Sequence, residues 1–223
     1  MRSGRLRRVR PAVALGALGT IGACCLAGAG VAALPSSPGL AIDAGWAALA
    51  AAAGVPPVVA VADVLAALGA SPVSVVLDAA VAAVVLLRAG VAPAACLVTA
   101  STANAGVVML TKALVHRPGP VVAFVGPYGS FPSGHTAFAA VLATSCVLLL
   151  GRRALPWAAG AVVVMALSRT VLAAHWLTDT VVGGVEGVAT TVLVWWLGGV
   201  VLRRVAARPD RDAATAPDAP GLG

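Results

Sequence analysis

The sequence contains apolar stretches long enough for a helix to cross the hydrocarbon core of a bilayer, which takes about 20 residues. We predict six membrane-spanning segments. They cover residues 11–34, 73–87, 91–114, 133–150, 155–174 and 177–202. Only 10% of the residues are charged, whereas soluble domains carry about 25%. The sequence therefore predicts an all-α, integral membrane helical bundle with about six transmembrane helices.

Two other regions differ from this pattern. Residues 58–68 form a short apolar stretch that Asp63 interrupts, so we predict an interfacial helix there rather than a seventh span. Residues 208–223 are rich in Pro, Ala and Asp, which predicts a disordered cytoplasmic tail. We assign residues 1–207 to one transmembrane domain. The first segment also resembles a signal peptide, but its apolar run exceeds the usual length of about 7–15 residues, which favours an uncleaved anchor.

The basic residues sort to one side of this topology, as the positive-inside rule requires. With the N-terminus in the cytoplasm, twelve of the 15 Lys and Arg residues fall at cytoplasmic ends. They are Arg2, Arg5, Arg7, Arg8, Arg10, Arg88, Arg152, Arg153, Arg203, Arg204, Arg208 and Arg211. The net charge of +7 therefore reflects orientation, and we expect no nucleic-acid partner. The same sorting places both termini in the cytoplasm. We also predict a bacterial plasma-membrane protein, because the nearly exclusive use of Arg over Lys is typical of a GC-rich bacterial genome.

The three remaining cations lie at the outer ends of the segments, together with all three histidines. This polar set comprises Lys112, His116, Arg117, Ser133, Gly134, His135, Ser168, Arg169, His175 and Asp179. Ionisable groups at membrane depth are costly and usually mark function. We therefore place the candidate site at the extracytoplasmic face. The four cysteines lie within apolar stretches, where a thiol behaves as a small hydrophobe.

Two histidines have neighbours that favour catalysis. His175 and Asp179 are four residues apart, so on a helix they share one face. A carboxylate that accepts the Nδ1 proton leaves Nε2 free as a nucleophile or base. His135 follows Ser133 and Gly134 at the start of a long apolar stretch, where a capped helix N-terminus binds anions. The alternatives are a structural His–Asp pair and an ordinary capped helix with an interfacial histidine.

Lys112, Arg117 and Arg169 add three fixed cations on the same side. Each one alone is better explained by snorkelling to lipid headgroups. Together with the two histidines and a helix N-terminus, they suit a phosphate ester, which needs cations for its oxygens, a nucleophile and a proton donor. Because no carboxylate cluster accompanies them in the sequence, we expect no metal site.

These blocks resemble the signature of the type-2 phosphatidic acid phosphatase superfamily, the lipid phosphate phosphatases. That signature consists of Lys-x6-Arg-Pro, Pro-Ser-Gly-His and Ser-Arg-x5-His-x3-Asp. The second block is present at residues 132–135, and residues 168–179 match every fixed position of the third. The first block departs, because Gly119 stands where the family has its phosphate-binding Arg, and Arg117 lies two residues earlier.

The resemblance implies a membrane phosphatase without a cofactor, which hydrolyses a lipid or polyprenyl (di)phosphate through a phosphohistidine. His175 would be the nucleophile, His135 the general acid and base, and Asp179 the residue that orients His175. The groups that would hold the phosphoryl oxygens are Lys112, Arg117, Ser133, Gly134 and Arg169, with Arg117 as a stand-in for the missing Arg.

Three alternatives stay open. A catalytically weakened lipid-phosphate binder fits the Gly at position 119. A phosphotransferase would use the same phosphohistidine with an acceptor other than water. A transporter would use the intramembrane Asp78 and Glu186 as proton carriers, although the one-sided site disfavours it. Phosphatidic acid, phosphatidylglycerol phosphate and polyprenyl diphosphates such as undecaprenyl diphosphate are all candidate substrates, and protein partners stay unassigned.

Overall fold

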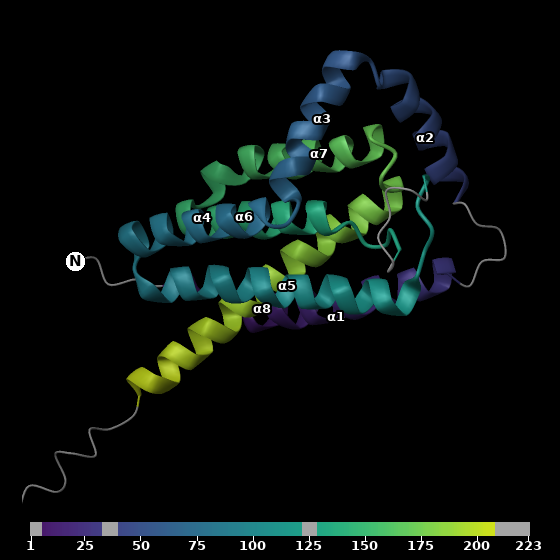
Figure 1. The fold of residues 1–223 in the computed structure, drawn as a ribbon. Helices are drawn as coiled ribbons and strands as arrows, with labels where there is room; N and C mark the ends of the chain where they lie inside the picture. Colours follow the sequence, from purple (N-terminus) through teal and green to yellow (C-terminus); the bar gives the residue numbers. More distant parts are fainter. Residues whose placement is uncertain (1–5, 33–39, 122–128, 208–223) are drawn as a thin grey trace, which may run out of the picture.

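The computed structural model describes residues 6–32, 40–121 and 129–207. Within these ranges the chain is mainly helical and contains no strand (Figure 1). The elements are α1 (Pro11–Ala32), α2 (Ala41–Ala53), α3 (Pro56–Gly69), α4 (Val73–Ala89), α5 (Val91–Val115), α6 (Gly134–Leu150), the short 3-10 helix η2 (Arg152–Ala154), α7 (Leu155–Val171) and α8 (Leu177–Ala206). The predicted all-α class is confirmed. The predicted tail, residues 208–223, lies outside the described residues.

All six predicted segments are helices, namely α1 and α4 to α8. Four helical stretches are long and apolar enough to cross a membrane: α1, α5, residues 152–171 and α8. Helices α4 and α6 have 17 residues each, which corresponds to about 26 Å. The chain is therefore a multi-pass membrane protein, and the number of six spans stays a prediction.

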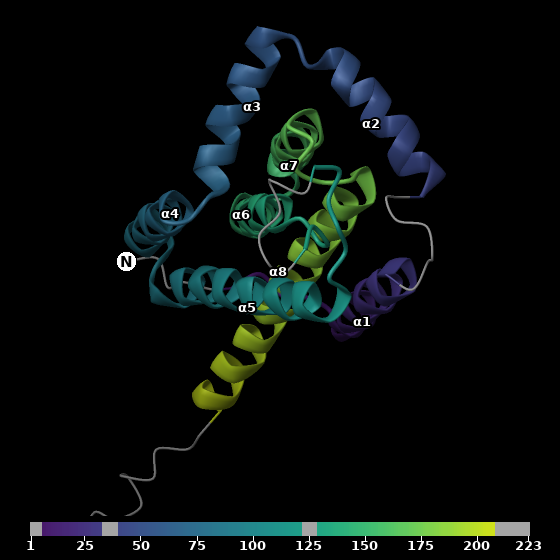
Figure 2. The same ribbon diagram turned by 45° about the vertical axis from the view of Figure 1, so that its right-hand side comes forward.

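The region before α4 differs from the prediction of one interfacial helix over residues 58–68. It forms two helices, α2 and α3, which are bent by 114° and count as one more span if they are taken as a single broken helix. The break coincides with Pro56, the first residue of α3. A proline drives the residue before it into an extended conformation, and Val55 has such a conformation, with φ −73° and ψ 153°. Both views show the pair as an arch over α7 (Figures 1 and 2).

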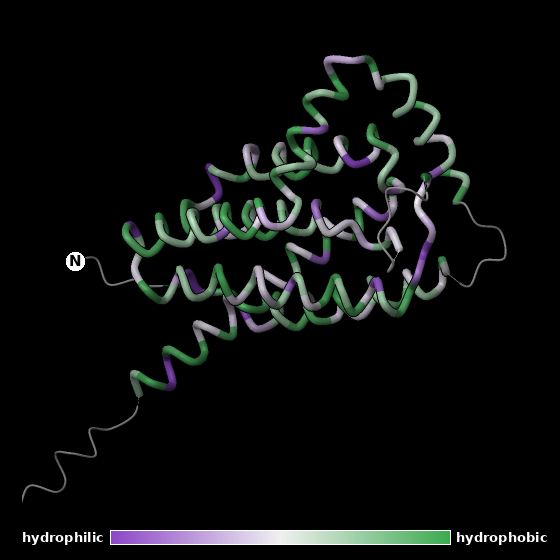
Figure 3. Tube along the Cα trace, in the orientation of Figure 1, coloured by the Kyte–Doolittle hydropathy of each residue, from purple (hydrophilic) through white to green (hydrophobic). Residues whose placement is uncertain are grey.

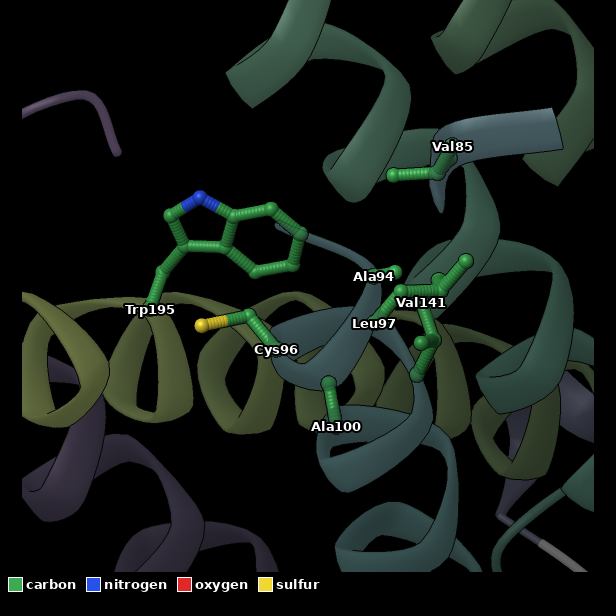
Figure 4. Close-up of a cluster of buried hydrophobic side chains, with 7 residues drawn as sticks. All are labelled: Val85, Ala94, Cys96, Leu97, Ala100, Val141 and Trp195. Atoms are coloured by element: carbon green, nitrogen blue, oxygen red, sulfur yellow. The ribbon is translucent and has the colours of Figure 1, made fainter. Parts of the chain in front are cut away.

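An apolar cluster holds the bundle together in the half that lies away from the α5–α6 connection. Its members are Val85, Ala94, Cys96, Leu97, Ala100, Val141 and Trp195, contributed by α4, α5, α6 and α8 (Figure 4). Leu97 is fully buried and Trp195 is 1% exposed. Cys96 packs within this cluster as a small apolar side chain, in line with the prediction for the cysteines.

Helices α6 and α8 approach each other so closely that only glycine fits between them. A Cβ atom on Gly183 would overlap the carbonyl oxygen of Ser133, and one on Gly187 would overlap that of Ala137. Small residues four apart are a common device for close helix packing in membranes. The contact brings the start of α6 against the first turn of α8, where the backbone N–H of Ser133 donates to the carbonyl of Asp179 at 2.9 Å.

We expect Gly183→Ala to destabilise the protein, because the new methyl group would push α6 away from α8. Overpacking of this kind costs about 1–3 kcal/mol and outweighs the gain in helix propensity of about 1 kcal/mol. Gly184→Ala is the matched control, since a Cβ there would lie 3.5 Å from Val162 and 3.6 Å from Thr136. Thermal unfolding in detergent should show a lower midpoint for the first variant only. Equal midpoints for the two would contradict the packing argument.

Candidate active site

The sequence blocks that were singled out meet at one end of the bundle. They lie at the C-terminal end of α5, the N-terminal end of α6, and the turn that links α7 to α8. This end is on the right in Figure 1, opposite the start of α1 and the end of α8. Hydrophilic stretches gather there, with a mainly hydrophobic middle section between them and the other end (Figure 3).

His175 lies in the turn between α7 and α8. The Arg169 carbonyl holds this turn by accepting from the backbone N–H groups of Ala174 at 3.1 Å and His175 at 3.3 Å. The His175 side chain is 12% exposed, and its Nδ1 lies 3.7 Å from Asp179 Oδ2. This distance is longer than a hydrogen bond, although catalytic hydrogen bonds are often long before substrate binds. The spacing predicted that both groups share one helix face, whereas His175 lies in the turn before α8 and only Asp179 lies on the helix, in its first turn.

Asp179 is fully buried and held on both oxygens. Its Oδ2 accepts from the backbone N–H of Trp176 at 3.0 Å, an interaction that caps the first turn of α8. Its Oδ1 accepts from Nη1 of Arg117 at 2.5 Å. The orientation of this carboxylate is therefore fixed by the protein.

The surroundings of His175 favour its neutral form. Burial lowers the pKa of His175 below its ordinary value, and the positive charges of Lys112 and Arg169 act in the same direction, while the Asp179 carboxylate opposes them. A neutral imidazole has a free lone pair. This is the state that a nucleophile needs at neutral pH.

The start of α6 presents backbone N–H groups beside His135. The first intrahelical bond runs from Ala137 N–H to the carbonyl of Ser133 at 3.0 Å, so the N–H groups of Gly134, His135 and Thr136 precede it. Ser133 is at the N-cap position, but its hydroxyl makes no cap hydrogen bond; it accepts from the Thr136 hydroxyl at 3.2 Å. These N–H groups are suited to an anion.

His135 is oriented by α3, a helix that the sequence did not connect with the site. Its Nε2 lies 3.1 Å from the carbonyl oxygen of Ala66, so Nε2 carries the proton in this hydrogen bond. Gly69, at the end of α3, is so close that an added Cβ would overlap the His135 ring. The arch formed by α2 and α3 therefore closes over this histidine.

Two of the predicted cations face this region. Lys112 donates to the carbonyl of Gly129 at 2.7 Å. Arg169 is 4% exposed, and within the described part of the chain its buried Nε has no hydrogen-bond partner. Both charges act on both histidines. A phosphoryl oxygen would satisfy the Arg169 Nε, which is costly to leave unpaired when buried.

Arg117 has a different environment from the predicted one. Its Nη2 donates to Asp43 Oδ2 at 2.6 Å, and its Nη1 donates to Asp179 and to the Thr178 hydroxyl. The guanidinium also lies 5.6 Å from the centre of the Trp176 ring. Direct contact between Arg117 and phosphate stays a prediction, whereas its contacts with two carboxylates are part of the structure.

Two further residues depart from the sequence-based picture. His116 is exposed and forms the left-handed C-cap of α5, with φ 47°, so it turns away from the buried groups. Asp43, on α2, is fully buried and belongs to the site, although the sequence analysis did not single it out. The one signal that could have identified it is its place as a lone carboxylate in the Ala-rich stretch from 41 to 53.

A small cavity of about 50 Å³ lies beside His175, lined by Asp43, Trp46 and Trp176 among others. It adjoins a much larger apolar cavity of about 990 Å³ between α1, α6, α7 and α8. Trp46, Thr170 and Leu177 line both.

Among the described residues, no three His, Cys, Asp or Glu side chains gather in a way that would hold a metal ion.

Comparisons with known proteins concern the family and the fold. Residues 93–201 match the model of the PAP2 superfamily, and this segment contains every predicted site residue. The predicted resemblance to this superfamily is therefore confirmed over that segment. The fold is similar to the crystal structure of a transmembrane PAP2-type phosphatidylglycerolphosphate phosphatase from Bacillus subtilis, with a TM-score of 0.63 and 17% identity over 88% of this chain and 98% of that one. No curated protein sequence matches this chain.

Proposed function

We propose that this protein is a membrane phosphatase that removes phosphate from a lipid or polyprenyl phosphate through a phosphohistidine intermediate. The observation that carries the proposal is the convergence of His175, His135 and the buried Arg169 at one end of the bundle, beside the N–H groups that open α6. Each group matches one requirement of phosphoryl transfer, namely a nucleophile, a proton donor and positive charge for the phosphoryl oxygens.

In the first step, the lone pair on His175 Nε2 attacks phosphorus, and the bond between phosphorus and the lipid oxygen breaks. His135, which starts this step protonated on both ring nitrogens, gives one proton to the departing oxygen, so the lipid leaves as an alcohol and the His135 ring becomes neutral. In the second step, His135 removes a proton from water while that water attacks phosphorus, and the P–N bond breaks. Inorganic phosphate is released, and His175 returns to its neutral form. The Asp179 carboxylate stabilises the positive charge on His175 while phosphorus is attached.

The apolar cavity supports a lipid substrate. It follows α8 from Leu177 to Val192, a length of about 22 Å at 1.5 Å per residue. This length accommodates most of a fatty acyl chain or several prenyl units, and the small cavity at His175 lies at its polar end. The sorting of basic residues to the opposite end supports an extracytoplasmic site.

The proposal is tested by assaying the detergent-purified protein against phosphatidic acid, phosphatidylglycerol phosphate, a polyprenyl diphosphate and a short-chain phosphate ester, with and without EDTA. We expect phosphate release that is insensitive to EDTA, because no carboxylate cluster accompanies the two histidines in the part of the chain that the structure describes. We also expect kcat/KM to be higher for the long-chain substrates. Loss of turnover with EDTA, restored by Mg²⁺ or Zn²⁺, would overturn the mechanism. Equal activity on the short-chain ester would overturn the lipid specificity.

The pH dependence of kcat/KM should reflect the neutral form of His175. Because burial lowers the pKa of His175, we expect activity to persist as the pH falls through about 6.5, the ordinary value for histidine, and to be lost at lower pH when the ring is protonated. The His135→Ala variant should retain this acidic limb, which assigns the limb to His175. An acidic limb centred above about 6.5 would contradict the assignment.

A further inference from the structure

We propose that Asp43 and Arg117 are positioning residues, which orient the carboxylate of Asp179 toward His175. Together these three residues form a buried ion triad (Asp43, Arg117 and Asp179). This inference rests on the proposed function and adds helix α2 to the parts of the fold that catalysis requires. It also gives Arg117 a role other than direct binding of phosphate.

The first link of the triad is the contact between α2 and the start of α8. Asp43 is fully buried. Its Oδ1 accepts from the backbone N–H of Thr178 at 2.9 Å, and its Oδ2 accepts from the Thr178 hydroxyl at 2.8 Å. The same Oδ2 accepts from Arg117 at 2.6 Å. These bonds fix Asp43 against the first turn of α8, where a negative charge is favoured by the helix dipole.

The second link is Arg117, whose side chain is 4% exposed. It joins Asp43 to Asp179 through different terminal nitrogens. The planar guanidinium holds two carboxylates at a fixed angle, which a lysine ammonium would not reproduce. With Oδ1 of Asp179 bound to Arg117, the other oxygen is left facing Nδ1 of His175 at 3.7 Å.

Charge balance explains why both carboxylates are needed. A guanidinium paired with Asp179 alone would neutralise the carboxylate that has to stabilise a positive His175. Asp43 supplies a second negative charge to the same guanidinium. Arg117 therefore neutralises less of the Asp179 charge, and more of that charge stabilises a positive His175. Buried ion pairs add little net stability compared with apolar packing, which favours a functional reason for placing three ionised groups here.

The decisive test is a double-mutant cycle with Asp43→Asn, Asp179→Asn and the combined variant, assayed on the lipid phosphate that the wild type hydrolyses. Loss of the partner that orients a metal-ligating histidine typically costs about 10- to 100-fold in activity, and we take the same range for the orientation of His175. We expect Asp43→Asn to lower kcat by that factor with KM nearly unchanged, and to have almost no further effect once Asp179 is Asn. Asp43→Glu should recover part of the loss.

The controls separate positioning from folding and from phosphate binding. Asp78→Asn changes another carboxylate, one that accepts from Ser101 in the α4–α5 contact, and it should leave kcat unchanged. Inorganic phosphate should inhibit the wild type and Asp43→Asn with the same constant. The inference fails if Asp43→Asn keeps the wild-type kcat, or if its loss is the same with and without Asp179, as a purely structural role predicts. A wild type that is inactive on every lipid phosphate would instead refute the proposed function and, with it, this inference.

Discussion

Replacing His175 with alanine is expected to abolish phosphate release. In the proposed mechanism His175 forms the covalent bond to phosphorus, and none of the other described side chains at the site is placed to take over that step. The side chain lies in a turn outside the helices and is largely buried, with 12% exposed, so the melting midpoint of the variant has to be measured together with its activity. Turnover of the preferred lipid phosphate should fall to the background rate in protein that is still folded.

His135→Ala provides the comparison for this result. A general acid contributes about 10²- to 10⁴-fold to the rate, so this variant should be slow but measurably active. A substrate with a better leaving group should restore part of its rate, because protonation of the leaving oxygen then matters less. Wild-type turnover in His175→Ala, or complete loss in His135→Ala alone, would mean that the two roles have been assigned wrongly.

The second large effect is expected for Arg169→Gln. Arg169 is the buried cation whose Nε has no partner in the described residues, and its charge acts on both histidines. If it binds a phosphoryl oxygen, the interaction should strengthen as charge builds in the transition state. We expect kcat/KM to fall by roughly 10²- to 10³-fold, the range for the loss of one such donor.

The matched control is Arg153→Gln, because Arg153 is an exposed arginine in η2, at the opposite end of α7. It should keep wild-type kinetics. The constant for inhibition by inorganic phosphate should rise in Arg169→Gln and stay the same in Arg153→Gln. An unchanged inhibition constant in Arg169→Gln would show that this residue does not touch the phosphate.

Hydrophobic length was a reliable guide to the fold where a segment was long and uninterrupted. Each predicted segment is a helix, since a bilayer requires backbone polar groups to be paired within the segment. The sequence failed between residues 35 and 70. There the run from 41 to 53 is composed mainly of Ala with one Asp and, at 13 residues, is too short to cross a bilayer as a helix, so α2 was missed.

The sequence also did not predict the close contact between α6 and α8. Gly183 and Gly187 are four residues apart, as in many helix pairs, but the spacing does not say which helix is the partner. The structure shows that the partner is α6, and that the contact places Ser133 against Asp179. This is how two motifs about 40 residues apart become one site.

Within the site, motif spacing singled out His175, Asp179 and Arg117, but the sequence did not connect Arg117 with Asp43, because that contact depends on long-range packing. His175 and Asp179 lie four apart on the chain, whereas Asp43 and Arg117 are separated by 74 residues. Nothing local marks the second pair. The Gly at position 119 suggested that Arg117 had taken over a phosphate contact, which stays a prediction, and the structure adds two carboxylate partners that the sequence did not indicate.

The central claim is that His175 carries the phosphoryl group, and rapid-quench labelling tests it most directly. Wild-type protein would be mixed with a lipid substrate that carries ³²P in its phosphate and quenched in base within milliseconds, followed by peptide mapping. The account predicts an acid-labile, base-stable label on the peptide that contains His175. The label should persist longer in His135→Ala, because hydrolysis of the intermediate is slowed, and it should be absent in His175→Ala. Label on a different residue, or rapid turnover with no labelled protein in either active form, would contradict the account.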